Sequence, residues 1–157
     1  MATILNVDSP FNESSGFGVT SPPSDGLPGG FAAAMIDCSI KNMASADVFE
    51  AISIPAGAVV LDVGVIVITG EGAAETIDLG DGDDADGYFD GKSVETAGMS
   101  YSLNMNLNNA GSYAQNATAF AGGKHYTSAD TIDVTAKAAL TVAKFVVWCK
   151  YIQTNLN

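Results

Sequence analysis

Apolar residues occupy every second position in many short runs from about residue 35 to the end of this chain. The segments 36–41 (IDCSIK) and 131–136 (TIDVTA) show the alternation most plainly. A two-residue period is that of a β-strand with one buried face, because successive side chains point to opposite sides. The pattern therefore predicts a chain built mainly from strands.

Two longer runs extend this prediction. The run 58–69 (AVVLDVGVIVIT) is apolar at both sets of alternate positions, with Leu61 on the same side as Val63, and predicts a central strand covered on two faces. The run 141–152 (TVAKFVVWCKYI) has an apolar side and a side carrying Lys144 and Lys150. This predicts a strand with a partly solvated face, or an edge strand whose lysines prevent pairing with another chain. Further strands are expected at 46–54, 75–80, 99–107 and 124–127.

About eight strands separated by Gly-, Asn- and Asp-rich turns, without regular strand–helix alternation, predict an all-β fold. We expect an antiparallel β-sandwich of jelly-roll-like type. The Ala- and Lys-rich segment 135–144 has helical propensity, but alternation on both sides favours a turn at 137–140. Residues 110–121 have room for one helical turn.

Composition changes near residue 30. The segment 1–30 contains five Gly, four Pro and five Ser, whereas Pro55 is the only later proline. Such a segment buries too little apolar surface to order itself alone, so we expect an extended N-terminal arm over 1–45 and a β-sandwich domain over 46–157. A flexible tail with incidental aromatics is the alternative. As contact residues of the arm we predict Phe11, Phe17, Pro22, Pro23, Leu27 and Phe31.

The net charge of the chain limits the kinds of molecule that it is expected to bind. The chain has 157 residues, 18 acidic and 6 basic, with a net charge of −12, and every basic residue is a lysine. Without arginine and with this charge, nucleic-acid binding is not expected. The apolar runs are shorter than the roughly 20 residues of a membrane-spanning helix, and the start lacks a signal-peptide pattern, so we expect cytoplasmic synthesis and no membrane contact. Charged residues make up 15%, which favours a protein partner.

The loop 80–91 (GDGDDADGYFDG) is the strongest candidate for a metal site. Carboxylates on a Gly-rich turn suit calcium, but the helix-flanked calcium motif fails, because Gly82 and Ser93 stand where acids are required. We therefore expect a solvated acidic turn, with an improvised calcium site at Asp81–Asp86 left open.

Catalytic interpretations are weak. The segment 70–75 (GEGAAE) superficially resembles a dinucleotide loop, but its glutamates would repel phosphate, and a hairpin turn explains it better. His125 is the only histidine, and Ser128 and Asp130 near it form no recognisable triad pattern. Cys38 and Cys149 are expected to be buried free thiols. We predict no enzymatic activity, no catalytic or metal-ligating residue and no cofactor.

Two segments carry a family resemblance. The first runs from Ser53 to Phe89 and includes SIPAGAVV, DLGDGDD and DGYF; the second runs from Gly123 to Ile152 and includes YTSADTIDV before a long final strand. In their order and spacing they resemble the capsid decoration, or cement, proteins of tailed bacteriophages. The segments 1–45 and 92–122 carry no such resemblance.

This resemblance implies a non-enzymatic β-sandwich subunit on the outer capsid surface of the virion. It implies that the protein bridges major capsid proteins, commonly as a homotrimer at three-fold positions. A carbohydrate- or receptor-binding module on the virion surface is the alternative, and would use exposed aromatic rings as stacking platforms. Its candidate residues are Tyr88, Phe89, Tyr101, Tyr113, Tyr126 and Trp148.

Overall fold

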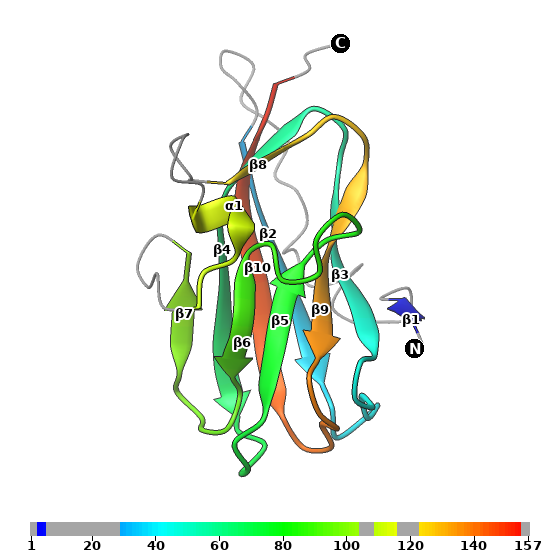
Figure 1. Ribbon diagram of the computed structural model, residues 1–157, viewed down its shortest axis with the longest axis vertical. Helices are drawn as coiled ribbons and strands as arrows, with labels where there is room; N and C mark the ends of the chain where they lie inside the picture. Colours follow the sequence, from blue (N-terminus) through cyan, green and yellow to red (C-terminus); the bar gives the residue numbers. More distant parts are fainter. Residues whose placement is uncertain (1–2, 6–28, 104–108, 116–122, 155–157) are drawn as a thin grey trace.

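The protein folds into two β-sheets packed face to face, as the computed structural model in Figure 1 shows. The structure describes residues 3–5, 29–103, 109–115 and 123–154. Sheet A has the order β1-β3-β9-β5-β6 and sheet B the order β2-β10-β4-β7, with β8 also paired to β4. The strands of sheet A are β1 (Thr3–Leu5), β3 (Val48–Ile54), β9 (Asp130–Ala136), β5 (Thr76–Gly80) and β6 (Phe89–Ser93). Those of sheet B are β2 (Gly29–Asp37), β10 (Lys144–Gln153), β4 (Ala58–Thr69), β7 (Ser100–Ser102) and β8 (Lys124–Tyr126).

The connectivity confirms the predicted jelly roll. Without the short strands β1 and β8, eight strands form two four-stranded sheets, β2-β10-β4-β7 and β3-β9-β5-β6. Every pairing among these eight strands is antiparallel, and the chain passes repeatedly from one sheet to the other. Two interlocked Greek keys of this order define the jelly-roll architecture.

The core lies between the sheets and is made by the inward half of each alternating strand. Val134 of β9 and Phe145 of β10 are fully buried, as are Val63 and Val65 of β4. Burial of one apolar side chain of this size contributes about 1.5–3 kcal/mol. The alternation seen in the sequence therefore positions both sheets around one interior.

Most predicted elements are confirmed. The predicted strand 58–69 coincides with β4. Residues 137–143 form turns, with Leu140 bridged to Met43 and no helix there, and the helical turn expected within 110–121 is α1 (Ser112–Gln115). The predicted strand 99–107 is β7 over Ser100–Ser102; residues 104–108 lie outside the described residues.

The boundary drawn at residue 45 differs from the structure. β2 pairs with β10 from Gly29 to Asp37, and Ala34, Ile36 and Met43 are buried in the core. Residues 29–45 thus belong to the sandwich, because the small side chains of GGFAAAM pack in an edge strand although their composition resembles a linker. Of the rest of the predicted arm, residues 3–5 form β1 beside β3, and 6–28 lie outside the described residues.

The strict alternation predicted for β4 is broken twice. The register with β10 shifts beside Leu61 and again beside Ile68, so each is an extra residue in a β-bulge. The first bulge turns Val60 into the core and leaves Leu61 41% exposed. Leu61 therefore does not share the buried side with Val63, and the expectation of two covered faces is wrong for this strand.

The segment 70–75 is a turn, but it does not close a hairpin, because β4 and β5 belong to different sheets. Its Glu71 carboxylate accepts hydrogen bonds from the backbone N–H groups of Thr141, Val142 and Ala143 at 2.8–3.1 Å. Burial raises the pKa of Glu71, but these bonds outweigh it and lower the pKa overall. Glu71 thus ties together two loops that cross between the sheets.

Candidate interaction surfaces

The outer side of sheet B is apolar. Outward positions of its three longest strands carry large hydrophobic side chains where a solvated antiparallel sheet would carry polar ones. Phe31 is 46% exposed, Ile66 42% and Ile68 48%. We call this surface the apolar face; it comprises Phe31, Ala33 and Met35 of β2, Ile66 and Ile68 of β4, and Val146 and Trp148 of β10.

Trp148 occupies the middle of the apolar face. Its ring stacks on Phe31, with centroids 5.9 Å apart and an interplanar angle of 22°. Gly64 lies opposite Trp148 in the adjacent strand, and a Cβ at this position would come within 2.3 Å of the indole ring. The glycine therefore lets the indole lie over β4.

Charges on the same side of sheet B are few and balanced. Lys144 forms an ion pair with Asp37, and Asp62 accepts hydrogen bonds from the Ser102 hydroxyl at 2.9 and 3.0 Å. The Lys150 ammonium lies 5.8 Å from the Trp148 ring centroid. Two lysines and two aspartates thus give this side no net formal charge, in a chain of net charge −12.

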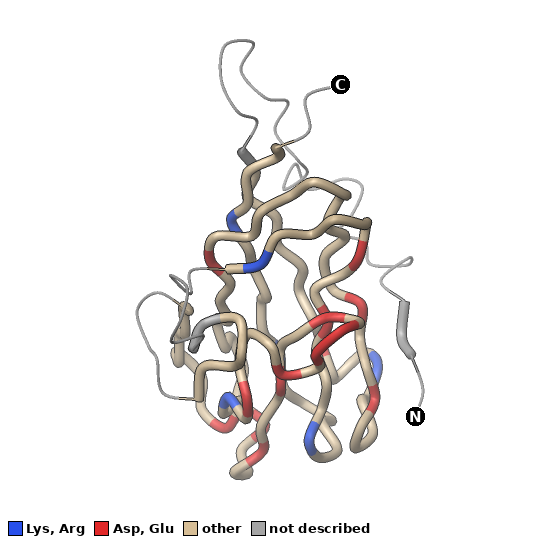
Figure 2. Tube along the Cα trace, turned by 45° about the horizontal axis from the view of Figure 1, so that its top comes forward, with Lys and Arg blue, Asp and Glu red and all other residues tan. Residues whose placement is uncertain are grey.

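The outer side of sheet A is acidic. Glu50 and Asp133 are direct neighbours on β3 and β9, and Asp78 lies on the same side of the next strand, β5, opposite Thr135. Figure 2 shows acidic residues gathered along these strands and the loops that follow them. Burial raises the pKa of Asp133 to about 6, and the charges of Glu50 and Asp130 add to the shift, whereas the Thr131 hydroxyl opposes it.

The acidic loop after β5 is not simply solvated, contrary to the expectation from the sequence. Asp81 is only 4% exposed, and its carboxylate accepts hydrogen bonds from the Lys124 ammonium and from the hydroxyls of Tyr113 and Tyr126, each at 2.7 Å. Burial raises the pKa of Asp81, but these donors outweigh it and lower the pKa overall. The network joins the loop to α1 and β8.

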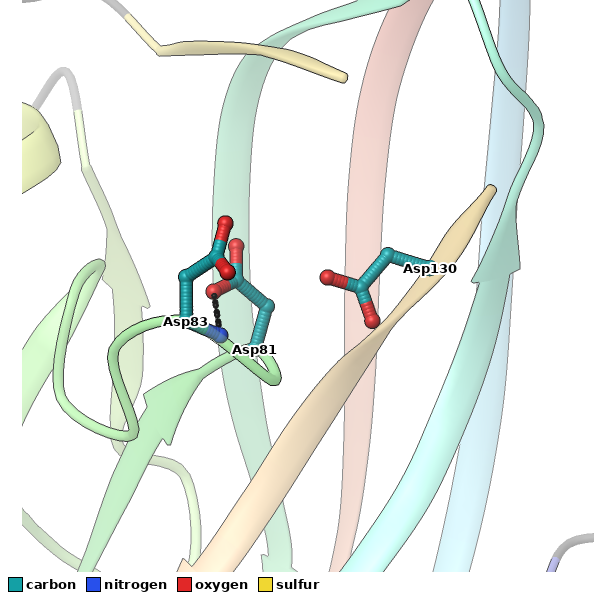
Figure 3. A group of neighbouring side chains, drawn as sticks. All are labelled: Asp81, Asp83 and Asp130. Carbon is teal, nitrogen blue, oxygen red and sulfur yellow. Dashed lines mark hydrogen bonds between the residues drawn. The ribbon is translucent and has the colours of Figure 1, made fainter. Parts of the chain in front are cut away.

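Three carboxylates at this loop meet the geometric requirement for a cation. Carboxylate oxygen atoms of Asp81, Asp83 and Asp130 lie within 4.8 Å of one another. Figure 3 shows that Asp81 and Asp83 come from the loop after β5 and Asp130 from the start of β9. The Lys124 ammonium already contacts Asp81 at 2.7 Å and Asp83 at 2.8 Å. An internal ammonium therefore supplies the positive charge that a calcium ion would otherwise provide, and nothing else here indicates a metal.

Most aromatic residues proposed as sugar platforms are core residues. Tyr88 and Phe89 are fully buried and Tyr126 is 2% exposed, while Tyr101 and Tyr113 are partly buried against the core. Trp148 alone of the six lies on the apolar face. A groove lined by several exposed rings is not formed by these six side chains.

No catalytic arrangement is found among the described residues. His125 is exposed on β8, and no hydrogen bond joins it to Ser128 or Asp130. Cys38 and Cys149 are buried free thiols, as predicted, and burial raises the pKa of each to about 12. Such thiols are poor nucleophiles at neutral pH.

The predicted arm residues are placed only in part. Phe31 lies on β2, in the apolar face, rather than in an extended arm. Phe11, Phe17, Pro22, Pro23 and Leu27 lie outside the described residues. The apolar face was not predicted from the sequence, although the low charged fraction of 15% and the hydrophobic second side of the run 58–69 were signals of it. Among the described residues, no helix has the length and hydrophobicity needed to cross a membrane.

Among known proteins, this chain resembles several solved structures in its fold. No family model matches the sequence, and no curated protein matches it. Among solved structures, a chain of the "Capsid of Ralstonia phage GP4" is 18% identical with a TM-score of 0.57, over 89% of this chain and 95% of that one. A chain of the "Cyanophage Pam1 capsid asymmetric unit" is 19% identical with a TM-score of 0.58, over 92% and 99%.

A third chain, from the "Acidic stable capsid structure of Helicobacter pylori bacteriophage KHP30", is 17% identical with a TM-score of 0.56, over 81% of this chain and 89% of that one. Identities this low establish the fold alone. Because each alignment spans most of both chains, the neighbours are chains of similar length that share this single sandwich.

Proposed function

We propose that this chain is a non-enzymatic structural protein of a bacteriophage virion, a capsid decoration or cement protein. It binds the outer surface of the icosahedral shell and stabilises the shell by bridging major capsid proteins. The observation that carries this proposal is the fold likeness, over 81–92% of this chain, to chains in three phage capsid structures. The sequence resemblance of 53–89 and 123–152 to capsid decoration proteins supports the proposal independently of the fold match.

The surface properties support a role in assembly. The apolar face suits contact with protein, since monomeric proteins seldom expose a broad contiguous apolar surface without a function. The acidic side of sheet A disfavours binding to the packaged genome, which fits an external position. The buried Asp81 carboxylate accepts hydrogen bonds from Lys124, Tyr113 and Tyr126, so this charged group stabilises the fold.

The N-terminal arm is proposed as the main shell contact. Phe11, Phe17, Pro22, Pro23 and Leu27 supply spaced apolar anchors on an otherwise polar segment. The protein acts as a homotrimer at three-fold positions, where each copy contributes one arm. Repeating a weak contact by symmetry gives strong overall binding, because later contacts form at a high effective concentration.

Quantitative mass spectrometry of purified virions tests the proposal. We expect a copy number comparable to that of the major capsid protein and a density outside the shell by electron cryomicroscopy. A few copies per virion, or a location on a tail fibre, would instead indicate a receptor-binding role.

Truncation tests the arm. A variant lacking residues 1–28 should keep the eight-strand sandwich and its melting transition, but should no longer rebind capsids stripped of the protein. Full occupancy of capsids by the truncated protein would exclude the arm as the shell contact.

A further inference from the structure

Exposed hydrophobic side chains are distributed unequally between the two sheets. Among the described residues, six large hydrophobic side chains are exposed, and four of these lie on β2 and β4 of sheet B, whereas none lies on a strand of sheet A. The four are Phe31, Leu61, Ile66 and Ile68. On the part of the strands that the structure describes, large hydrophobic side chains are therefore exposed to water on sheet B and not on sheet A.

The outer side of sheet B, which holds the apolar face and the charged and polar residues around it, is broad enough for a stable contact. β10 has ten residues and lies between β2 and β4. At about 3.4 Å per residue and about 4.8 Å between strands, the strands of sheet B cover roughly 600 Å². Covering this area on two copies would bury about 1,200 Å², the lower end of the range for specific protein interfaces.

Electrostatics selects the same surface. Two copies of a chain with net charge −12 repel each other through most orientations. The side of sheet B has a balanced charge, because Lys144 is paired with Asp37 and the charge of Lys150 offsets that of Asp62. This side can approach a second copy without bringing the acids of sheet A together.

We propose that the apolar face binds a second copy of this chain and is the surface through which the protein self-associates. The inference rests on the self-association included in the proposed function and gives it a location. Among the described residues, no other surface offers a matching apolar area, so in the proposed homotrimer the apolar faces of the three copies meet around the three-fold axis. Trp148 and Phe31 form the centre of the contact, and adjacent copies cover each other's Ile66 around the symmetry axis.

Substitution of an exposed residue tests this without disturbing the core. Ile66→Lys places a charge in the apolar face, whereas Ile40→Lys makes the same change at a residue that is 82% exposed in the turn after β2 and serves as the matched control. Sedimentation velocity and native mass spectrometry should show a discrete oligomer for the full chain and for Ile40→Lys at micromolar concentration. Ile66→Lys should weaken association at least 100-fold, with an unchanged melting temperature of the monomer.

Two results would overturn the proposal. A full-length chain that stays monomeric at 100 µM, or an oligomer that persists in both Ile66→Lys and Trp148→Gln, would show that this face does not bind a second copy. A monomer whose Ile66→Lys variant loses capsid binding would identify the shell as the occupant of the face. That outcome would contradict this inference but not the proposed function. A protein that forms the expected oligomer but is absent from virions would contradict the proposed function but not this inference.

Discussion

Sheet A and sheet B are built from strands of the same alternating type, yet their outer sides differ in chemistry. Both sheets send alternate apolar side chains into one core. On sheet A the remaining positions include Glu50, Asp78 and Asp133, and on sheet B they include Ile66, Val146 and Trp148. The inward side chains of the strands therefore specify the core of the sandwich, while the outward side chains determine the chemistry of its two surfaces.

The largest expected effect lies at the acidic loop between β5 and β6 of sheet A. Asp81→Ala removes the carboxylate that pairs with Lys124 and accepts bonds from two tyrosine hydroxyls. The Lys124 ammonium, 16% exposed, then keeps only the exposed Asp83 carboxylate as a partner, and the hydroxyls of Tyr113 and Tyr126 lose an acceptor, so we expect a loss of about 3 kcal/mol in unfolding free energy.

Chemical denaturation measures this change. Asp83→Ala is the control, because Asp83 also contacts Lys124 but is 80% exposed, and its loss should cost less than about 1 kcal/mol. Equal effects of the two substitutions would contradict a structural role for the buried Asp81 network.

The second expected effect is the pH dependence of stability that arises from Asp133 on sheet A. The folded protein raises the pKa of Asp133 from 3.8 to about 6 and so binds its proton more tightly than the unfolded chain does. The contribution of Asp133 to the free energy of unfolding is therefore fully present below about pH 4. It is lost as the pH rises from 4 through 6, because the folded state must then give up a proton that it holds more tightly. Asp133→Asn should match the wild type near pH 4 and exceed it by about 2–3 kcal/mol above pH 7.

Urea denaturation at a series of pH values checks this prediction. Glu95→Gln removes one exposed carboxylate and serves as the control for the change in net charge. A constant difference between Asp133→Asn and the wild type from pH 4 to pH 8 would show that Asp133 titrates as an ordinary carboxyl.

The third effect concerns the ring pair on sheet B. Stacked aromatic pairs contribute about 0.5–1.5 kcal/mol beyond their burial. A double-mutant cycle with Phe31→Ala and Trp148→Ala should therefore give a coupling free energy in this range. The cycle is measured on monomers in the Ile66→Lys background, and additive effects would show that the two rings do not interact in solution.

The smallest effect is expected for folding stability when the apolar face itself is made polar. Ile66→Ser removes a side chain that is already 42% exposed, so the unfolding free energy of the monomer should change by less than about 1 kcal/mol. Differential scanning calorimetry of dilute protein measures this. A loss as large as that of a buried core residue would show that the outer side of sheet B stabilises the fold rather than serving contact.

Sequence alternation predicted most of the strands and the jelly-roll class, because the two-residue period follows directly from strand geometry. It did not predict β6, and it extended a strand over residues 38–40, which form a turn. It failed at Leu61, where a bulge shifts the register by one residue, and at residues 29–45, where small side chains resemble a linker. It also failed at Asp81, because the donors that bury this carboxylate come from Tyr113, Lys124 and Tyr126, in segments far along the chain.

The sequence by itself determined a two-layer β-sandwich with two buried thiols and a strongly negative charge, since composition and local periodicity carry that information. Only the tertiary structure decided which side of each strand faces water. Strand order placed the apolar outer positions of β2, β4 and β10 next to one another and the acids of β3, β5 and β9 on the opposite side. The physical reason is that a surface is made by residues from distant strands, and their adjacency depends on pairing that no local pattern encodes.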